Sequence, residues 1–148
     1  MILVRALSTR AARAAPPPLM AGMKVIELAN VLAGPTVCQF LAELGAEVIK
    51  IENTTTQGDV TRTWRLENDP DDSSVTAYFS CCNLGKQSVA LDLRDSRGLA
   101  AVHAMVQNAD VVVASYKPGD AEKLKVDYLY QGVTNQGKLK VVKEICAI

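Results

Sequence analysis

Short apolar runs alternate along this chain with segments whose apolar residues recur at helical spacing. Four runs have the length and the β-branched content of strands: Lys24–Leu28, Glu47–Glu52, Ser88–Leu93 and Asp110–Ala114. The last is apolar at almost every position, which is typical of a parallel strand covered on both faces. The pattern therefore predicts four short strands, the last of them buried on both faces.

Helices are predicted between these strands. One begins at Gly34-Pro35, continues through Val37–Leu44 and ends at a glycine. A second follows Asp95, a good N-cap residue, and carries apolar side chains at positions i, i+3 and i+7. A third, short helix follows a Pro-Gly pair and ends near Leu124.

The polar stretch from Asn53 to Ser74 is predicted to be one long loop. Strand, helix, strand, loop, strand, helix, strand is a βαβ series, so the predicted fold is α/β with a Rossmann-like parallel sheet and flanking helices. Such sheets bind ligands outside the carboxyl ends of their strands. The loops expected to form a site are Ala29–Pro35, the segment from Asn53 onward, Arg94–Ser96 and Ser115–Gly119.

Composition and charge exclude several classes of protein. Of the 148 residues, 16 are basic and 16 acidic, a balance that gives no reason to expect a nucleic-acid partner. No apolar run approaches the roughly 20 residues that span a bilayer, so the chain is not expected to be an integral membrane protein. His103 is expected to be a structural histidine within a helix. Four cysteines lack metal-site spacing and are expected to be free thiols: Cys38, Cys81, Cys82 and Cys146.

The first 22 residues differ in charge from the rest of the chain. They contain Arg5, Arg10 and Arg13 and no acidic residue. The first acidic residue of the chain is Glu27. An arginine-containing leader without acids is typical of a mitochondrial transit peptide, here followed by a proline-containing linker. Residues 1–22 are therefore predicted to be a transit peptide and linker that direct the chain to the mitochondrial matrix. The alternative is an N-terminal tail without a targeting role.

The loop motifs narrow the class of ligand. The dinucleotide fingerprint G-x-G-x-x-G and the P-loop motif are both absent, which argues against NAD and ATP sites of those types. Four basic residues near predicted strand ends could instead gather an anionic, phosphate-bearing ligand: Lys86, Arg94, Lys117 and Lys123. The alternative for each lysine is an ordinary solvated surface position.

Four ordered blocks of this sequence resemble the family III CoA-transferases. They are VIELANVLAGPTVCQFLAELGAEVIKIEN, GDVTRTW, NLGKQSVALDLRDSRG and ADVVVASYKPGDAEKL. The family includes formyl-CoA, carnitine and succinyl-CoA-dependent transferases and the related α-methylacyl-CoA racemase, and the D-x-T-R-x-W piece favours the transferase branch. The resemblance implies that residues 23–128 are the N-terminal, CoA-binding part of the family's domain, so that the sheet is incomplete.

The resemblance also implies a set of CoA-binding residues: Leu32, Ala33, Leu91, Arg94, Ser115, Tyr116, Lys117 and Lys123. Arg94 stands in the place of a family lysine and Lys123 in that of a family arginine. Asn53 and Gln87 depart from the basic residues usual in the family. The alternatives are that Tyr116 only covers the edge of the sheet and that Arg94 only begins a helix.

The activity implied is transfer of CoA from an acyl-CoA, such as succinyl-CoA, to a carboxylic acid. CoA and acyl-CoA would be substrates rather than tightly bound cofactors, and family members form homodimers. Residues 129–148 do not resemble the family segment that contains the nucleophilic aspartate, so no catalytic residue is assigned and this divergent tail is expected to leave the chain inactive alone. Two alternatives remain: a non-catalytic CoA-binding or regulatory module that pairs with a full-length subunit, and an unrelated Rossmann-like oxidoreductase or nucleotide binder.

Overall fold

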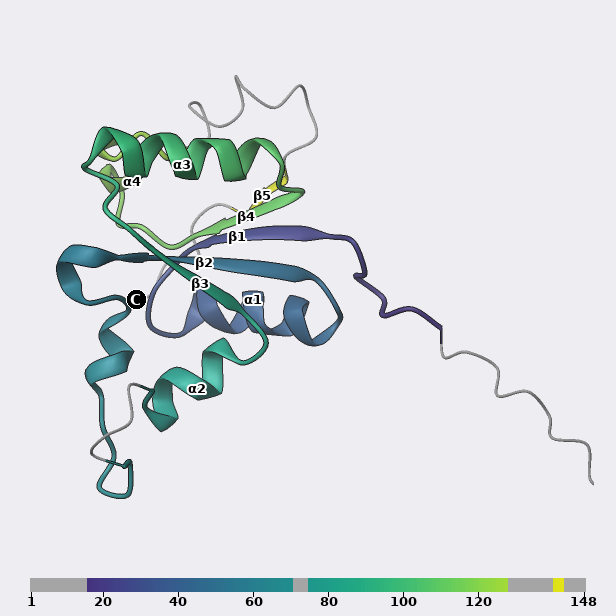
Figure 1. Cartoon of the computed structure of the whole chain (residues 1–148), viewed down its shortest axis with the longest axis vertical. Helices are drawn as coiled ribbons and strands as arrows, with labels where there is room; N and C mark the ends of the chain where they lie inside the picture. Colours follow the sequence, from purple (N-terminus) through teal and green to yellow (C-terminus); the bar gives the residue numbers. More distant parts are fainter. Residues whose placement is uncertain (1–15, 71–74, 128–139, 143–148) are drawn as a thin grey trace, which may run out of the picture.

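The chain folds around one parallel sheet. The structure, a computed structural model, describes residues 16–70, 75–127 and 140–142. Five strands are found in these ranges: β1 (Lys24–Leu28), β2 (Glu47–Asn53), β3 (Gln87–Leu91), β4 (Val111–Ala114) and β5 (Lys140–Val142). Their order is β3-β2-β1-β4-β5 and every pair of neighbours is parallel (Figure 1). The predicted α/β fold with a Rossmann-like sheet is therefore confirmed.

Helices cover both faces of this sheet. The structure contains α1 (Ala33–Glu43), α2 (Ala77–Asn83), α3 (Ser96–Gln107) and α4 (Asp120–Lys123). Helices α3 and α4 lie on one face, and α1 and α2 lie on the other (Figure 1). This arrangement gives the sheet two separate apolar cores.

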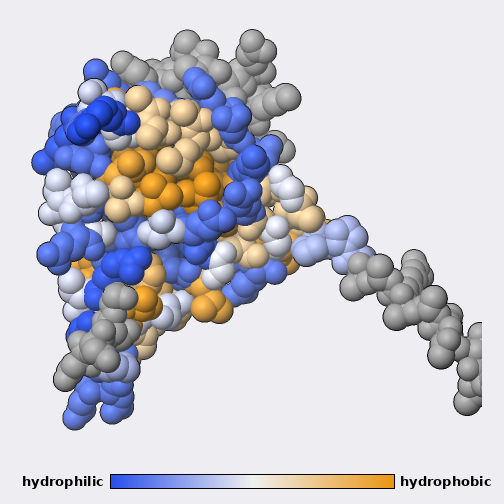
Figure 2. All heavy atoms as spheres, viewed as in Figure 1, coloured by the Kyte–Doolittle hydropathy of each residue, from blue (hydrophilic) through white to orange (hydrophobic). Residues whose placement is uncertain are grey.

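Alternate side chains of β1 enter different cores, as expected of a strand covered on both sides. Ile26 packs with Val102 and Val106 of α3, whereas its neighbour Val25 packs with Cys38 of α1. Apolar side chains also reach the surface below α3, where they are framed by hydrophilic residues (Figure 2). Val112 and Val113 of β4, the strand predicted to be covered on both faces, are fully buried.

The long loop predicted from Asn53 to Ser74 is wrong in part. Two 3₁₀ turns occupy it, Thr54–Thr56 and Val60–Thr63, and they are capped by side chains that accept from the backbone two residues on. Asn and Asp side chains readily form such hydrogen bonds with the nearby backbone. Because both residues are also common in irregular loops, the sequence alone did not distinguish these turns from a loop. Helix α2 was not predicted, because its seven residues are too few to show a helical period.

Other element boundaries differ little from those predicted. Strand β3 ends at Leu91 rather than Leu93, and β2 reaches Asn53. Asp95 caps α3 by accepting from the Arg97 backbone, as predicted. Strand β5 lies inside the tail 129–148, for which no element was predicted, and it pairs with β4.

Several predictions fall outside the described residues. Most of the leader 1–22 and most of the tail lie there, as does Cys146, so the transit peptide, the mitochondrial location and the homodimer stay predictions. Within the described ranges, no helix combines the length and the apolar character needed to cross a membrane. The same ranges contain no group of three or more His, Cys, Asp or Glu side chains placed to hold a metal ion.

The cap of α2 gives a direct test of how this helix is attached. The fully buried Thr76 hydroxyl accepts a hydrogen bond from the Phe79 backbone at 3.0 Å and donates one to the Thr61 carbonyl oxygen at 2.7 Å. Thr76→Val keeps the shape but leaves both groups unpaired, so we expect the free energy of unfolding in urea to fall by about 2 kcal/mol. Thr76→Ser keeps the hydroxyl and is the matched control. Equal stability of the two variants would show that these bonds do not hold α2.

Candidate functional site

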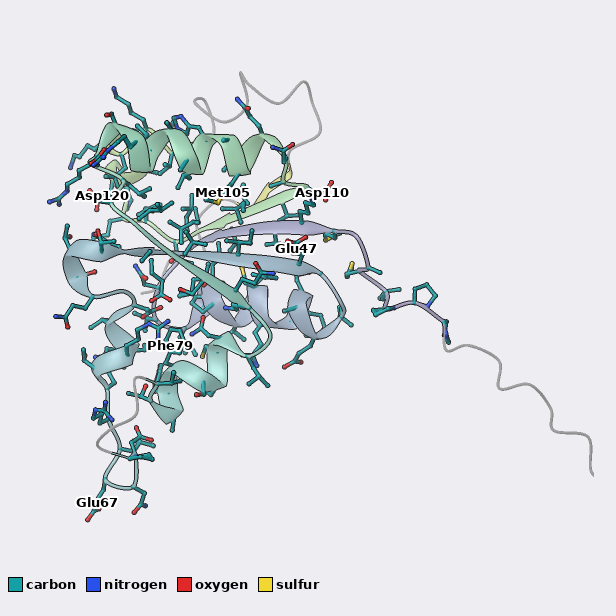
Figure 3. All side chains as sticks on the ribbon, viewed as in Figure 1. Glu47, Glu67, Phe79, Met105, Asp110 and Asp120 are labelled. Atoms are coloured by element: carbon teal, nitrogen blue, oxygen red, sulfur yellow. The ribbon has the colours of Figure 1, made fainter. Side chains whose placement is uncertain are left out.

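A cavity of about 120 Å³ opens at the carboxyl ends of the strands. Its wall comes from the segments that follow β1, β2, β3 and β4 and from the end of α4: Leu28, Ala29, Asn30, Ile51, Asn53, Leu91, Asp92, Leu93, Arg94, Tyr116 and Leu124. Asp120 lies toward this end of the molecule, whereas Glu47 and Asp110, at the starts of β2 and β4, lie toward the opposite end (Figure 3). In the strand order, β2 lies on one side of β1 and β4 lies on the other, so the direction in which strands are added reverses at β1. The cavity lies beyond the carboxyl ends of the strands at this point, which is where such sheets bind ligands.

Three predicted site residues line this cavity: Leu91, Arg94 and Tyr116. The Tyr116 ring packs against the core cluster on the α3 face, and burial raises the pKa of its hydroxyl to about 12. The Arg94 side chain is exposed and no ion pair is found for it within the described residues, while its backbone N–H donates to Asp92 Oδ1 at 2.8 Å. The cavity thus joins a largely apolar wall to a cation at the surface.

The other predicted residues lie near the cavity but not in its wall. Leu32 is half exposed at the N-cap position of α1 and Ala33 is the first residue of that helix. Ser115 Oγ accepts from the Asn30 backbone at 3.4 Å, so this side chain joins the loops that follow β1 and β4. Ser115 therefore has at least a structural role.

The predicted cations fall into two groups. The Lys117 and Lys123 side chains are exposed, and Lys123 Nζ lies 3.4 Å from an Asp120 carboxylate oxygen. Lys86 is 2 % exposed and pairs with Glu27, so the prediction that it gathers phosphates at a strand end is wrong. It precedes β3 rather than following a strand, and its side chain enters the interior beneath α1.

Sequence reasoning missed the polar residues that complete the wall. Asn30, Asn53 and Asp92 line the cavity, although only Asn53 had been noted, as a departure from the resembled family. Each of these residues ends a strand or lies one or two positions beyond it, which was the signal available in the sequence.

Below the loop Ala29–Pro35 lies a buried cluster of charged side chains. Glu27 is central: its Oε1 lies 2.8 Å from Lys50 Nζ and its Oε2 lies 2.7 Å from Lys86 Nζ. Lys50 Nζ also lies 2.9 Å from Asp59 Oδ2. All four side chains are at most 2 % exposed, and two carboxylates face two ammonium groups. We name these four residues the charge cluster.

The two lysines of the charge cluster hold both ends of the loop. Lys50 Nζ donates to the Ala29 carbonyl oxygen at 2.7 Å, and Lys86 Nζ donates to that of Pro35 at 2.8 Å. Burial lowers the pKa of Lys50, but the carboxylates of Glu27 and Asp59 outweigh it and hold this pKa above its ordinary value. For Lys86 burial prevails over Glu27 and the pKa is lowered.

Asp59 holds the middle of the same loop. The Val31 backbone N–H donates to Asp59 Oδ1 and Oδ2 at 3.3 and 3.2 Å. Val31 has a φ of 71°, a left-handed conformation that is unfavourable for a β-branched residue and persists only where its surroundings impose it. Asp59 also accepts from the backbone and hydroxyl of Thr61. Sequence reasoning quoted Asp59 within D-x-T-R-x-W but gave it no role.

A third buried carboxylate, Glu52, extends this network. It accepts from Arg62 Nε at 2.7 Å, Arg62 Nη2 at 2.6 Å, Ser88 Oγ at 2.6 Å and the Asp59 backbone at 2.9 Å. Burial raises the pKa of Glu52, but these hydrogen bonds outweigh it and bring the pKa to about 2. The Arg62 guanidinium stacks over the Phe79 ring at 3.8 Å. Glu52 therefore links β2, β3 and the segment that carries Asp59.

Replacing Asp59 should loosen the loop above it. Asp59→Asn removes one of the two carboxylates that pair with Lys50 and the charged acceptor of Val31, so we expect the free energy of unfolding to fall by about 3 kcal/mol. Under native conditions the Val31 amide should exchange its hydrogen faster. The control is Asp120→Asn, because breaking the exposed pair with Lys123 should cost less than about 1 kcal/mol. Unchanged exchange at Val31 would show that Asp59 does not hold the loop.

The lowered pKa of Glu52 makes stability depend on acid. A carboxyl group with a folded pKa of about 2 and an ordinary pKa of 4.5 stabilises the fold above pH 4.5, and this contribution is lost as the pH falls toward 2. We expect urea unfolding to show a steeper loss of stability in this range for the unaltered chain than for Glu52→Gln. Parallel curves would exclude Glu52 as a source of acid sensitivity.

Comparison with known proteins agrees with this geometry. The model of the family described as CoA-transferase family III matches residues 20–131. A succinate–glutarate CoA-transferase from Agrobacterium fabrum is 44% identical over 114 residues, which cover 75% of this chain and 28% of that protein. Human succinyl-CoA:glutarate CoA-transferase is 36% identical over 107 residues, covering 72% of this chain and 24% of that protein.

Solved structures give the same result. A CAIB/BAIF family protein from Brucella suis superposes with a TM-score of 0.75 at 41% identity, covering 81% of this chain and 32% of that one. The protein Rv3272 from Mycobacterium tuberculosis gives 0.76 at 31% identity, covering 86% and 34%. The chain thus spans between a quarter and a third of the length of these relatives. Because the family model matches most of its residues, this chain belongs to CoA-transferase family III.

Proposed function

We propose that this chain supplies the CoA-binding part of an enzyme that moves CoA from an acyl-CoA to a carboxylic acid. The observation that carries the proposal is that Leu91 and Arg94, from the end of β3 and the segment after it, meet Tyr116, from the segment after β4, at one cavity beyond the strand ends. Relatives named for succinyl-CoA and glutarate support succinyl-CoA as the donor and a dicarboxylic acid as the acceptor. No catalytic residue of this chain is assigned, and the transfer step belongs to the whole enzyme.

The shape of the cavity suits part of CoA rather than all of it. At about 120 Å³ it is too small for a whole CoA molecule but has room for a narrow, largely apolar portion. The Leu28, Ile51 and Leu91 side chains supply apolar contacts, and Asn53 offers an amide that can both donate and accept. In this proposal the remainder of CoA lies across the surface beside the cavity.

The exposed cations suit the phosphates of CoA. Arg94 lines the cavity and its guanidinium can donate two parallel hydrogen bonds to one phosphate group. Within the described residues, Asp120 is the one ion-pair partner found for Lys123, and a phosphate could replace this long and exposed pair at small cost. Lys117 is exposed on the loop that follows β4. We propose Arg94 as the principal phosphate ligand and the two lysines as weaker ones.

The loop after β1 would then lie against the other end of the ligand. Leu32 is half exposed and available for contact, and Ala33 begins α1 beside it. The charge cluster fixes this loop from below, so binding would not require the loop to be ordered first. In this proposal the loop after β1 is held in one position, whereas the exposed Arg94 side chain can adjust to the ligand.

CoA binding by the full chain tests this proposal. We expect titration calorimetry to detect CoA binding and Arg94→Ala to weaken it about tenfold, which corresponds to about 1.4 kcal/mol. The matched control is Arg97→Ala, because Arg97 lies one turn away, outside the cavity wall, and pairs with Asp95. Equal weakening by both variants would place the phosphates elsewhere.

Two further outcomes separate the alternatives. CoA binding that appears only after mixing with a full-length family member would favour the regulatory module. Tight NAD binding with no CoA binding would contradict the proposal and favour a nucleotide-binding role. The proposed homodimer is a separate matter, which ultracentrifugation of the whole enzyme would decide.

A further inference from the structure

Two neighbouring thiols on α2 take no part in the cavity or the charge cluster. Cys81 Sγ and Cys82 Sγ lie 3.4 Å apart. Cys81 is exposed, whereas Cys82 is buried and its Sγ lies 3.9 Å from Thr36 Oγ1 of α1. One thiol of the pair can therefore meet a reagent from solution, and the other lies directly behind it.

We propose that Cys81 and Cys82 form a binding site for a monosubstituted trivalent arsenical, a soft electrophile that takes two sulfur ligands. A structural zinc ion needs four ligands, and the described residues offer no cluster of three or more His, Cys, Asp or Glu side chains. A trivalent arsenic atom that already carries one carbon substituent needs only two thiols. The number of ligands at this position therefore matches this class of reagent.

The distance between the sulfur atoms supports the same class. Two bonds of about 2.3 Å, the length usual for a thiolate on a soft ion, meet at about 95° when the sulfur atoms are 3.4 Å apart. Such an angle suits a pyramidal three-coordinate atom. A linear two-coordinate metal would need the sulfur atoms about 4.6 Å apart on the same bond length. A disulfide would need them at about 2.0 Å, between adjacent residues of a helix.

The reaction at this site balances without a change of oxidation state. An arsenic–oxygen double bond and the two S–H bonds break, two arsenic–sulfur bonds form, and the oxygen leaves as water. Cys81 reacts first because it is exposed, and Cys82 closes the ring. The hydrogen bond with Cys82 and burial raise the pKa of the Cys81 thiol, which slows thiolate-dependent oxidation but leaves this condensation of thiols possible.

Closing the ring would also act on α1. The Cys82 side chain would no longer rotate freely. It contacts Thr36 of α1, and the residue before Thr36, Pro35, accepts a hydrogen bond from Lys86 through its carbonyl oxygen. Binding to the folded chain alone also raises its stability by mass action. Binding of the arsenical at the surface is thus expected to affect α1 through Cys82 and Thr36.

Phenylarsine oxide added to the full chain tests the proposal. We expect intact mass measurement to show one phenylarsenic group per chain that survives excess monothiol and is removed by a dithiol. Alkylation of the folded protein should then find Cys81 and Cys82 protected. The Cys146→Ser variant should keep the adduct.

A relocation variant gives the matched control. Ser80→Cys/Cys81→Ser keeps the number of thiols but moves one of them to position 80, where the Ser80 hydroxyl donates to the Thr76 carbonyl oxygen, and so removes the 3.4 Å contact with Cys82. We expect half-labelling to need about tenfold more phenylarsine oxide, because the second thiol no longer acts at high effective concentration. Cys81→Ser alone should lose the monothiol-resistant adduct. Unchanged half-labelling in the relocation variant, retention of that adduct in Cys81→Ser, or its loss in Cys146→Ser would overturn the proposal.

Discussion

The pairing of two carboxylates with two ammonium groups inside the protein is the constraint on which the rest of this structure depends. Glu27 lies in the central strand and binds Lys50 from one neighbour and Lys86 from the segment that leads into β3. Removing four charges from water costs several kcal/mol for each ion, and only close pairing with further hydrogen bonds compensates for it. The cluster is therefore stable only as a complete set, which ties β1, β2 and the residues before β3 to one relative position.

The loop beside the cavity at the strand ends is held in place by this set of charges. Backbone carbonyl groups at both ends of the loop Ala29–Pro35 and the amide at its centre are all bound to side chains of the cluster. The cavity itself is lined by the ends of β1, β2 and β3 and by residues just beyond the strand ends. Sites of this kind hold their shape before a ligand arrives, because their loops are supported by packed and charged groups beneath them.

Patterns that depend on neighbouring residues were readable from the sequence. The apolar runs gave the central strands, and residues directly beyond strand ends included Arg94 and Tyr116 of the cavity. Features that depend on distant partners were not readable. Lys86 resembles any solvated lysine until Glu27 is placed beside it, and α2 is too short to have a period. Strand β5 has only three residues, and its pairing with β4 depends on the finished sheet.

The completeness of the charge cluster has a consequence for how such a sequence can change over time. A mutation that neutralises Lys50 alone removes the ammonium partner of Asp59 and one of the two partners of Glu27. A mutation of Glu27 alone leaves Lys86 without its carboxylate and Lys50 with Asp59 only. Each first step therefore passes through a less stable protein. Divergence at these positions is expected to proceed by paired replacements, in which the loss of a carboxylate and the loss of an ammonium group accompany each other. Exposed residues such as Lys117 are not part of this cluster and can be replaced singly without leaving a buried charge unpaired.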